Sequence, residues 1–158
     1  MSQIVEEAKA EYGRAQVRLI KALERTKEDK LNWSPSSTAR TPIQIAAHAA
    51  MGTSGISGML KGEPFPFASM ADMDAKLREM EKQYTTVDQV KALLETNSNA
   101  YLTWLDSLTD EQVASTAQLP MGAFPMAGAI TFAADHIRGH VSQIEYIQTI
   151  YGDHDWGF

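Results

Sequence analysis

Four long segments of this 158-residue chain repeat apolar or small residues at intervals of three and four. Such spacing gathers those side chains on one face of an α-helix, which turns once every 3.6 residues. The alternation that marks a half-buried strand is not sustained over any segment of useful length. We therefore predict an all-α fold, a four-helix bundle in which each helix buries one face against its neighbours.

The sequence marks the ends of these helices with different clarity. The expected segments are residues 3–28, a helix that begins near residue 42, residues 86–108, and residues from about 127 to 151. Thr41 and Gln44 form the pattern of a capping box, and Pro42 suits the first helical position because its missing N–H is not needed there. Thr86 can cap the third helix, and Gly152 is suited to end the fourth.

The connections between these segments differ in length. Residues 29–40 contain a proline and a cluster of Ser and Thr, which predict a loop. Residues 62–85 form the longest connection, and their charged stretch at 72–83 predicts a short exposed helix. Residues 109–116 predict one more helical turn, and residues 117–128, rich in Pro and Gly, predict a loop or small hairpin. The long second connection permits a crossover in place of simple up-down-up-down order.

Length and charge limit the partners and the compartment. The chain carries 14 Lys and Arg against 20 Asp and Glu, a net charge of −6, with no dense basic run. Nonspecific binding to nucleic acid needs clustered cations that displace counterions from phosphates, so we expect no nucleic-acid partner. Residues 1–16 are charged from Glu6 onward and contain no continuous apolar segment, so we expect no secretory signal and no membrane span. The expectation is one soluble, cytoplasmic domain over residues 1–158.

The absence of cysteine narrows the available chemistry. Disulfides, cysteine-based zinc sites and a thiol nucleophile supplied by the protein are all excluded. A metal site in this chain must therefore use His, Asp or Glu side chains. The four histidines are the first candidates.

Two of these histidines, His136 and His140, stand at positions i and i+4 of the expected last helix. Their side chains leave one face about 6 Å apart and can converge on a single ion. His48 lies on the inward stripe of another helix, where bundle geometry can bring it opposite the pair. The competing interpretation is that each is an ordinary core histidine satisfied by a hydrogen bond. A shared metal ion satisfies all three, whereas each buried imidazole left unpaired costs about 1–3 kcal/mol.

Three neutral imidazoles from two helices occupy one side of an ion and leave at least one position for water or substrate. That arrangement is typical of a catalytic metal site and differs from a closed structural one. Zinc is the default expectation. Nickel and iron are the alternatives, because imidazole suits all three metals.

The chain resembles the DinB-like (DinB/YfiT-like) four-helix metalloproteins in three stretches, "WSP" at 33–35, "TPIQIAAH" at 41–48 and "HIRGHVSQIEYI" at 136–147. The resemblance implies an up-down-down-up bundle with a long crossover between the second and third helices, often assembled as a homodimer. It also implies that His48, His136 and His140 bind one divalent metal at one end of the core. Gln143 matches the H-x-x-Q continuation usual in that family.

Members of that family with assigned activity are mostly thiol-dependent, and include transferases that use bacillithiol and isomerases that use mycothiol. The resemblance therefore implies a metal-dependent thiol transferase, or a related enzyme that activates a low-molecular-weight thiol or water toward a small-molecule substrate. Any such thiol comes from outside the protein, because the chain has no cysteine. Two alternatives stay open: a non-catalytic metal-binding or small-ligand-binding protein, such as a stress-response factor, and a structural bundle with metal-free histidines.

The remaining polar candidates are weaker, and no residue stands out as a general base. Gln143 and Asn97 lie on inward stripes, where either can hydrogen-bond a ligand histidine or a metal-bound water. The alternative is that they satisfy helix ends or loop backbone. Gln143 is the stronger candidate for a residue that orients a ligand. Asp135 is expected to be an exposed helical carboxylate, and His154 a solvated side chain of the tail, outside the site.

Overall fold

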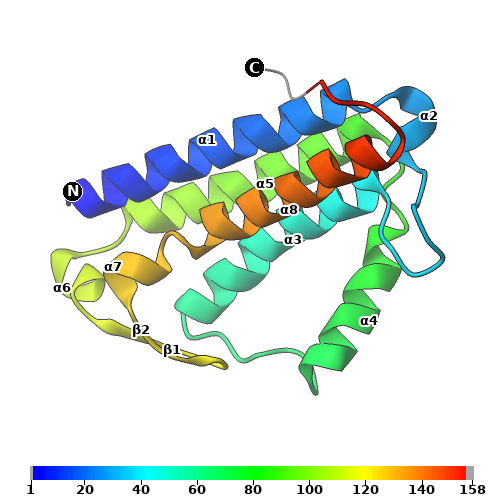
Figure 1. The fold of residues 1–158 in the computed structure, drawn as a ribbon. Helices are drawn as coiled ribbons and strands as arrows, with labels where there is room; N and C mark the ends of the chain where they lie inside the picture. The colour runs from blue at the N-terminus through cyan, green and yellow to red at the C-terminus, as the bar shows by residue number, and fades with distance from the viewer. Residues whose placement is uncertain (1, 156–158) are drawn as a thin grey trace.

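A computed structural model describes residues 2–155, which form the four long helices that the periodicity predicts. They are α1 (Gln3–Arg25), α3 (Pro42–Leu60), α5 (Val87–Asp106) and α8 (Phe132–Ile150). In Figure 1, α1 and α8 run in one direction and α3 and α5 in the other, the up-down-down-up order. Both α1 and α3 pack against α5 and α8, so the four helices close around one core. The all-α four-helix prediction is confirmed.

Shorter elements join the long helices. Within the described residues they are α2 (Glu28–Leu31), α4 (Met70–Glu81), α6 (Asp110–Val113), β1 (Thr116–Leu119), β2 (Gly122–Pro125) and α7 (Met126–Ala129). The two strands pair antiparallel with Leu119 opposite Gly122, so of the loop or small hairpin expected over residues 117–128 the structure shows the hairpin, which begins one residue earlier, at Thr116. No helix in this part of the chain is long and apolar enough to cross a membrane.

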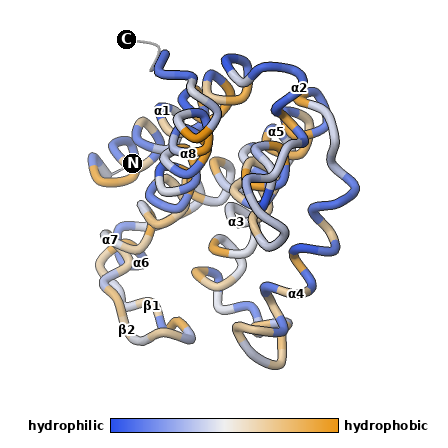
Figure 2. Tube along the Cα trace, turned by 45° about the vertical axis from the view of Figure 1, so that its right-hand side comes forward, coloured by the Kyte–Doolittle hydropathy of each residue, from blue (hydrophilic) through white to orange (hydrophobic). Residues whose placement is uncertain are grey.

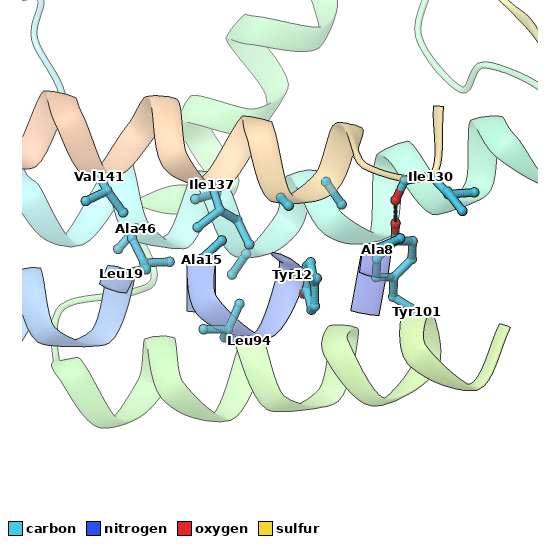
Figure 3. Close-up of a cluster of buried hydrophobic side chains, with 14 of the residues drawn as sticks. Ala8, Tyr12, Ala15, Leu19, Ala46, Leu94, Tyr101, Ile130, Ile137 and Val141 are labelled. Atoms are coloured by element: carbon cyan, nitrogen blue, oxygen red, sulfur yellow. Dashed lines mark hydrogen bonds between the residues drawn. The ribbon is translucent and has the colours of Figure 1, made fainter. Parts of the chain in front are cut away.

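The core holds α3 tightly between its neighbours. Figure 3 shows side chains from all four long helices meeting there, among them Leu19, Ala46, Leu94 and Ile137. Four alanines of α3, at positions 46, 47, 49 and 50, are completely buried and let α5 and α8 approach closely. The capping box of Thr41 and Gln44 is present at the start of α3, as the sequence predicts. Side chains on α3 are therefore presented by a rigid element.

The crossover helix α4 lies outside the bundle, as Figures 1 and 2 show. It begins after Ser69, whose side chain accepts a hydrogen bond from the Asp72 backbone. The sequence predicts an exposed helix over 72–83, and most of α4 is indeed exposed or half-buried. Glu81 is the exception, with only 1% of its surface exposed. The exposed-helix prediction is therefore wrong for this last residue of α4.

The first and last helices differ most from the expected ones, while the third, predicted to reach residue 108, ends at Asp106. The first helix, predicted to reach residue 28, ends at Arg25, because Thr26 takes an extended conformation and turns its hydroxyl back to the Ala22 carbonyl. The predicted last helix, 127–151, is split into α7 and α8 at Ile130 and Thr131. The Tyr101 hydroxyl of α5 donates to the Ile130 carbonyl at this break, as Figure 3 shows. A long-range side-chain contact of this kind leaves no mark on local periodicity.

Candidate metal centre

The histidines lie at the edge of the core, and this corrects the expectation that they occupy its inward stripe. The buried positions of α8 include Ala133, Ile137, Val141 and Ile144, so His136 and His140 fall on the neighbouring, half-buried flank. On α3, the His48 side chain is likewise partly accessible, with 13% exposed. On α8, the histidine positions and the fully buried positions both follow the three-and-four spacing. Periodicity alone therefore does not decide which of these two sets faces the core.

The fold nevertheless brings the three predicted histidines together. One ring nitrogen of each lies within 4.8 Å of those of the other two. The ring centroids of His136 and His140 are 4.4 Å apart, and His48 reaches across from α3 at 4.7 Å from the His140 centroid. Within residues 2–155 this is the one cluster of three or more His, Asp or Glu side chains close enough to hold a metal ion.

The Nε2 atom of His136 tests whether the cluster suits a metal. It is buried and has no hydrogen-bond partner among the described residues. The ring lies directly against Gly52 of α3, where a Cβ atom would come within 2.2 Å of this nitrogen. Buried polar atoms are nearly always satisfied, and an unpaired one calls for an explanation such as an ion. The donor set, three imidazoles converging from two helices, fits a divalent metal.

Each of the other two rings is held through its Nδ1 atom. His48 Nδ1 lies 2.8 Å from Oε1 of Glu81, the buried carboxylate of α4. His140 Nδ1 lies 2.8 Å from Oε1 of Gln143, one turn further along α8. An imidazole whose Nδ1 is engaged in this way has Nε2 left as its donor atom. Gln143 therefore contacts a candidate ligand, as the sequence suggests.

Glu81 was not among the residues that the sequence singles out, and neither was Arg40. The Arg40 guanidinium holds the Glu81 carboxylate, with Nε at 2.6 Å from Oε2 and a second nitrogen at 3.1 Å from Oε1. Arg40 also pairs with Asp74 of α4 at 2.9 Å. The charged stretch at 72–83 has the composition of a solvated helix face, so no sequence signal distinguishes Glu81 from its neighbours.

The other candidates have structural partners. Asn97 donates to the Ala50 carbonyl of α3 at 2.9 Å, a backbone group in the interior of that helix and not at a helix end or loop. Asp135 is exposed and pairs with Arg138 at 2.9 Å. His154 is an exposed residue of the tail, outside the histidine cluster.

Burial keeps the histidines of α8 neutral. It lowers the pKa of His136 to about 3, helped by the nearby His140 and His48, and it also lowers the pKa of His140. For Glu81, burial alone would raise the pKa, but hydrogen bonds from His48 and Arg40 outweigh it and lower the pKa. His136 and His140 are therefore uncharged and Glu81 is ionised, and neutral imidazole is the state in which histidine binds a metal.

These pKa shifts predict how the stability of the metal-free protein depends on pH. The folded pKa of His136 is lower than the unfolded one, so its contribution is complete above about pH 6.5 and is lost as the pH falls. The slope approaches about 1.4 kcal/mol per pH unit for one such histidine, and His140 acts in the same direction. Urea unfolding between pH 7.5 and 5.5 measures this slope, which His136→Gln should make shallower. Equal slopes in the two proteins would contradict the assignment.

An open groove lies beside Gln143, the residue that contacts His140. Its volume is about 510 Å³. Its walls combine apolar and polar side chains: Pro35, Ala39, Arg40, Ile45, Arg78, Ser142, Gln143, Tyr146, Ile147 and Ile150. Gln143, which lines the groove, holds His140 directly, and Arg40, which also lines it, holds Glu81, the partner of His48.

Comparison with known proteins identifies the family. The model of the DinB superfamily matches residues 11–144, which include all four long helices in whole or in part and all three clustered histidines. The chain belongs to the DinB superfamily. This assignment confirms the resemblance seen in the sequence. No curated protein sequence matches the chain.

Solved structures with low sequence identity share this DinB fold. YfiT from Bacillus subtilis, described as a probable metal-dependent hydrolase with an unusual four-helix bundle topology, has a TM-score of 0.73 and 18% identity, covering 97% of this chain and 91% of its own. An uncharacterised protein from Clostridium difficile 630 has a TM-score of 0.72 and 16% identity, covering 95% and 98%. A mycothiol-dependent maleylpyruvate isomerase has a TM-score of 0.68 and 14% identity, covering 91% of this chain and 63% of its own.

Proposed function

We propose that His48, His136 and His140 bind one divalent metal ion, zinc by default, and that this DinB-superfamily protein is a metal-dependent enzyme. The observation that carries the proposal is the convergence of three ring nitrogens within 4.8 Å, one of them buried and unpaired. A metal held by neutral imidazoles lowers the pKa of a bound thiol or water, so that the nucleophilic anion exists at neutral pH.

The residues around the cluster suit attack by an external nucleophile on a small electrophilic substrate. The three imidazoles approach from α3 and α8 only, which leaves the remaining side for a thiol or water. Gln143 orients the His140 ring through its Nδ1 atom. The groove beside Gln143 has apolar walls that can hold the body of a substrate and polar groups that can orient it. A thiol transferase is the first candidate, with the thiol supplied from solution.

The proposed assembly follows the family resemblance, whereas the proposed location and the absence of nucleic-acid partners follow the composition of the chain. We propose a homodimer that acts on a small molecule in the cytoplasm, without nucleic-acid partners. Sedimentation of the purified protein measures the oligomeric state, and a monomer at micromolar concentration would contradict the dimer.

Metal analysis of protein purified without a histidine tag tests whether the three histidines bind a metal ion. We expect about one divalent ion per chain, loss of that ion in His140→Ala, and retention in His154→Ala, which removes an exposed histidine outside the cluster. A wild-type protein that takes up no divalent ion at any loading would rule out the metal-dependent function.

Conjugation of a generic electrophile, assayed with several biological thiols, tests whether the protein catalyses metal-dependent thiol transfer. We expect turnover that requires the metal-loaded protein and stops on addition of a chelator. Equal rates with and without chelator would exclude metal-dependent transfer. Metal uptake without turnover by any thiol or water would indicate a binding protein instead.

A further inference from the structure

Glu81 is the only fully buried residue of α4, and its side chain is charged. Carboxylates are rarely buried to this extent unless they are paired. A helix normally docks onto a bundle through apolar side chains, and α4 presents none that is fully buried. The contact that anchors the end of α4 is therefore an ionic and hydrogen-bonded one.

The partners of Glu81 fix both of its oxygens. Arg40 donates to Oε1 and Oε2 through two nitrogens of its planar guanidinium, at 3.1 and 2.6 Å. Arg40 is itself held by Asp74, which also accepts from Arg78 at 2.8 Å. A carboxylate gripped in this bidentate way has a defined plane and direction. Its Oε1 atom then points at a fixed place, the Nδ1 atom of His48.

This contact determines which nitrogen of His48 carries the proton. An ionised carboxylate only accepts hydrogen bonds, so the 2.8 Å contact requires a proton on Nδ1 of His48. In the neutral form of the ring, a proton on Nδ1 leaves the lone pair on Nε2. The other tautomer, with the proton on Nε2, would place the lone pair of Nδ1 against a lone pair of the carboxylate oxygen and would direct an N–H at the ion.

We propose that Glu81, clamped by Arg40, is a positioning residue of the metal centre, which fixes the tautomer and orientation of His48 from the crossover helix. Glu81 has this role only if His48 is a metal ligand, as proposed above. A buried ion pair adds little net stability compared with apolar packing, so the arrangement makes better sense as a device that serves the site.

The same contact couples α4 to the metal. If a docked α4 raises the affinity of His48 for the ion, the bound ion must stabilise the docked state of α4 by the same free energy. Metal binding is therefore expected to slow hydrogen exchange in the last turn of α4, around Glu81, which the metal does not touch.

Zinc affinity of Glu81→Gln, measured by competition with a chromophoric chelator, tests the proposal. The substitution preserves the shape of the side chain, and Asp74 remains to pair with Arg40. We expect zinc to bind about 10–100-fold more weakly, the usual effect of losing a group that orients a ligand histidine. Glu79→Gln is the matched control: it removes the same charge from the same helix at a side chain that is 71% exposed, and its affinity should equal that of the wild type.

Several outcomes separate this proposal from the one before it. Zinc binding of wild-type strength in folded Glu81→Gln would overturn the role of Glu81 and leave the histidine site standing. If zinc still slows hydrogen exchange in the last turn of α4 in Glu81→Gln, the proposed role of Glu81 is overturned as well. If that variant does not fold, the wild-type protein decides: nitrogen NMR of the metal-free imidazoles at pH 8 should show His48 protonated on Nδ1. A proton on Nε2 would refute the proposal.

Discussion

Gly52→Ala is expected to abolish tight metal binding while the bundle stays folded. The added Cβ atom would lie 2.2 Å from Nε2 of His136. Two atoms that are not bonded to each other do not come this close, so the ring must move. The displaced atom is the far end of a side chain, which makes the movement inexpensive for the fold. It is also the proposed donor atom, so the same movement removes one of three ligands. We expect zinc affinity to fall by more than the roughly 100-fold that marks the loss of an orienting group.

Gly55→Ala is the matched control for this experiment. Gly55 lies on the same helix, and a Cβ atom built there meets nothing within 4 Å. Alanine is favoured over glycine inside a helix by about 0.5–1 kcal/mol, so Gly55→Ala should be slightly more stable than the wild type and bind zinc unchanged. Zinc titration and thermal unfolding of both variants measure the two effects. Equal zinc affinities in Gly52→Ala and Gly55→Ala would show that His136 is not a ligand.

Metal binding is expected to produce a large gain in stability. A ligand that binds only the folded state adds about 4 kcal/mol to the free energy of unfolding when its free concentration is 1,000 times Kd. The imidazoles of α3 and α8 come together only in the folded protein, so the unfolded chain should bind zinc far more weakly. Urea unfolding with buffered zinc, and again with excess chelator, measures the difference.

Two histidine variants establish the origin of that gain. His140→Ala should show no zinc-dependent stabilisation, whereas His154→Ala, altered at an exposed tail residue, should retain all of it. If zinc stabilises His140→Ala as much as the wild type, the ion binds somewhere other than the histidine cluster. Loss of the effect in His154→Ala would place the tail at the site, against the arrangement described above.

The sequence predicts the features that are written locally. Thr41, Pro42 and Gln44 place the start of α3 at the correct residue, because a capping box acts within one turn. The i, i+4 spacing of His136 and His140 places both rings on one flank of α8 for the same reason. That His48 lies on a second helix of the bundle is also read from the sequence, whereas its position opposite the pair depends on how α3 packs against α8.

The features that escape prediction depend on distant packing. The break between α7 and α8 involves a hydrogen bond from Tyr101 to Ile130, whose residues lie 29 positions apart. The burial of Glu81 depends on where the crossover returns to the bundle and meets Arg40, 41 positions earlier in the chain. Neither distance falls within the span of a helical period. The helix α4, whose composition predicts a solvent-exposed helix, thus supplies Glu81, the residue that contacts His48.

The crossover is a geometric obligation of this bundle. Because α3 and α5 run in the same direction, the chain must travel back along the full length of α3, about 28 Å for its 19 residues, before α5 can begin. An antiparallel neighbour would need only a tight turn and would bring no extra helix past the outer side of α3. The return path carries α4 across that side, and its last turn places Glu81 against His48. In this topology, the segment required for chain return also supplies the carboxylate that holds one candidate ligand, His48.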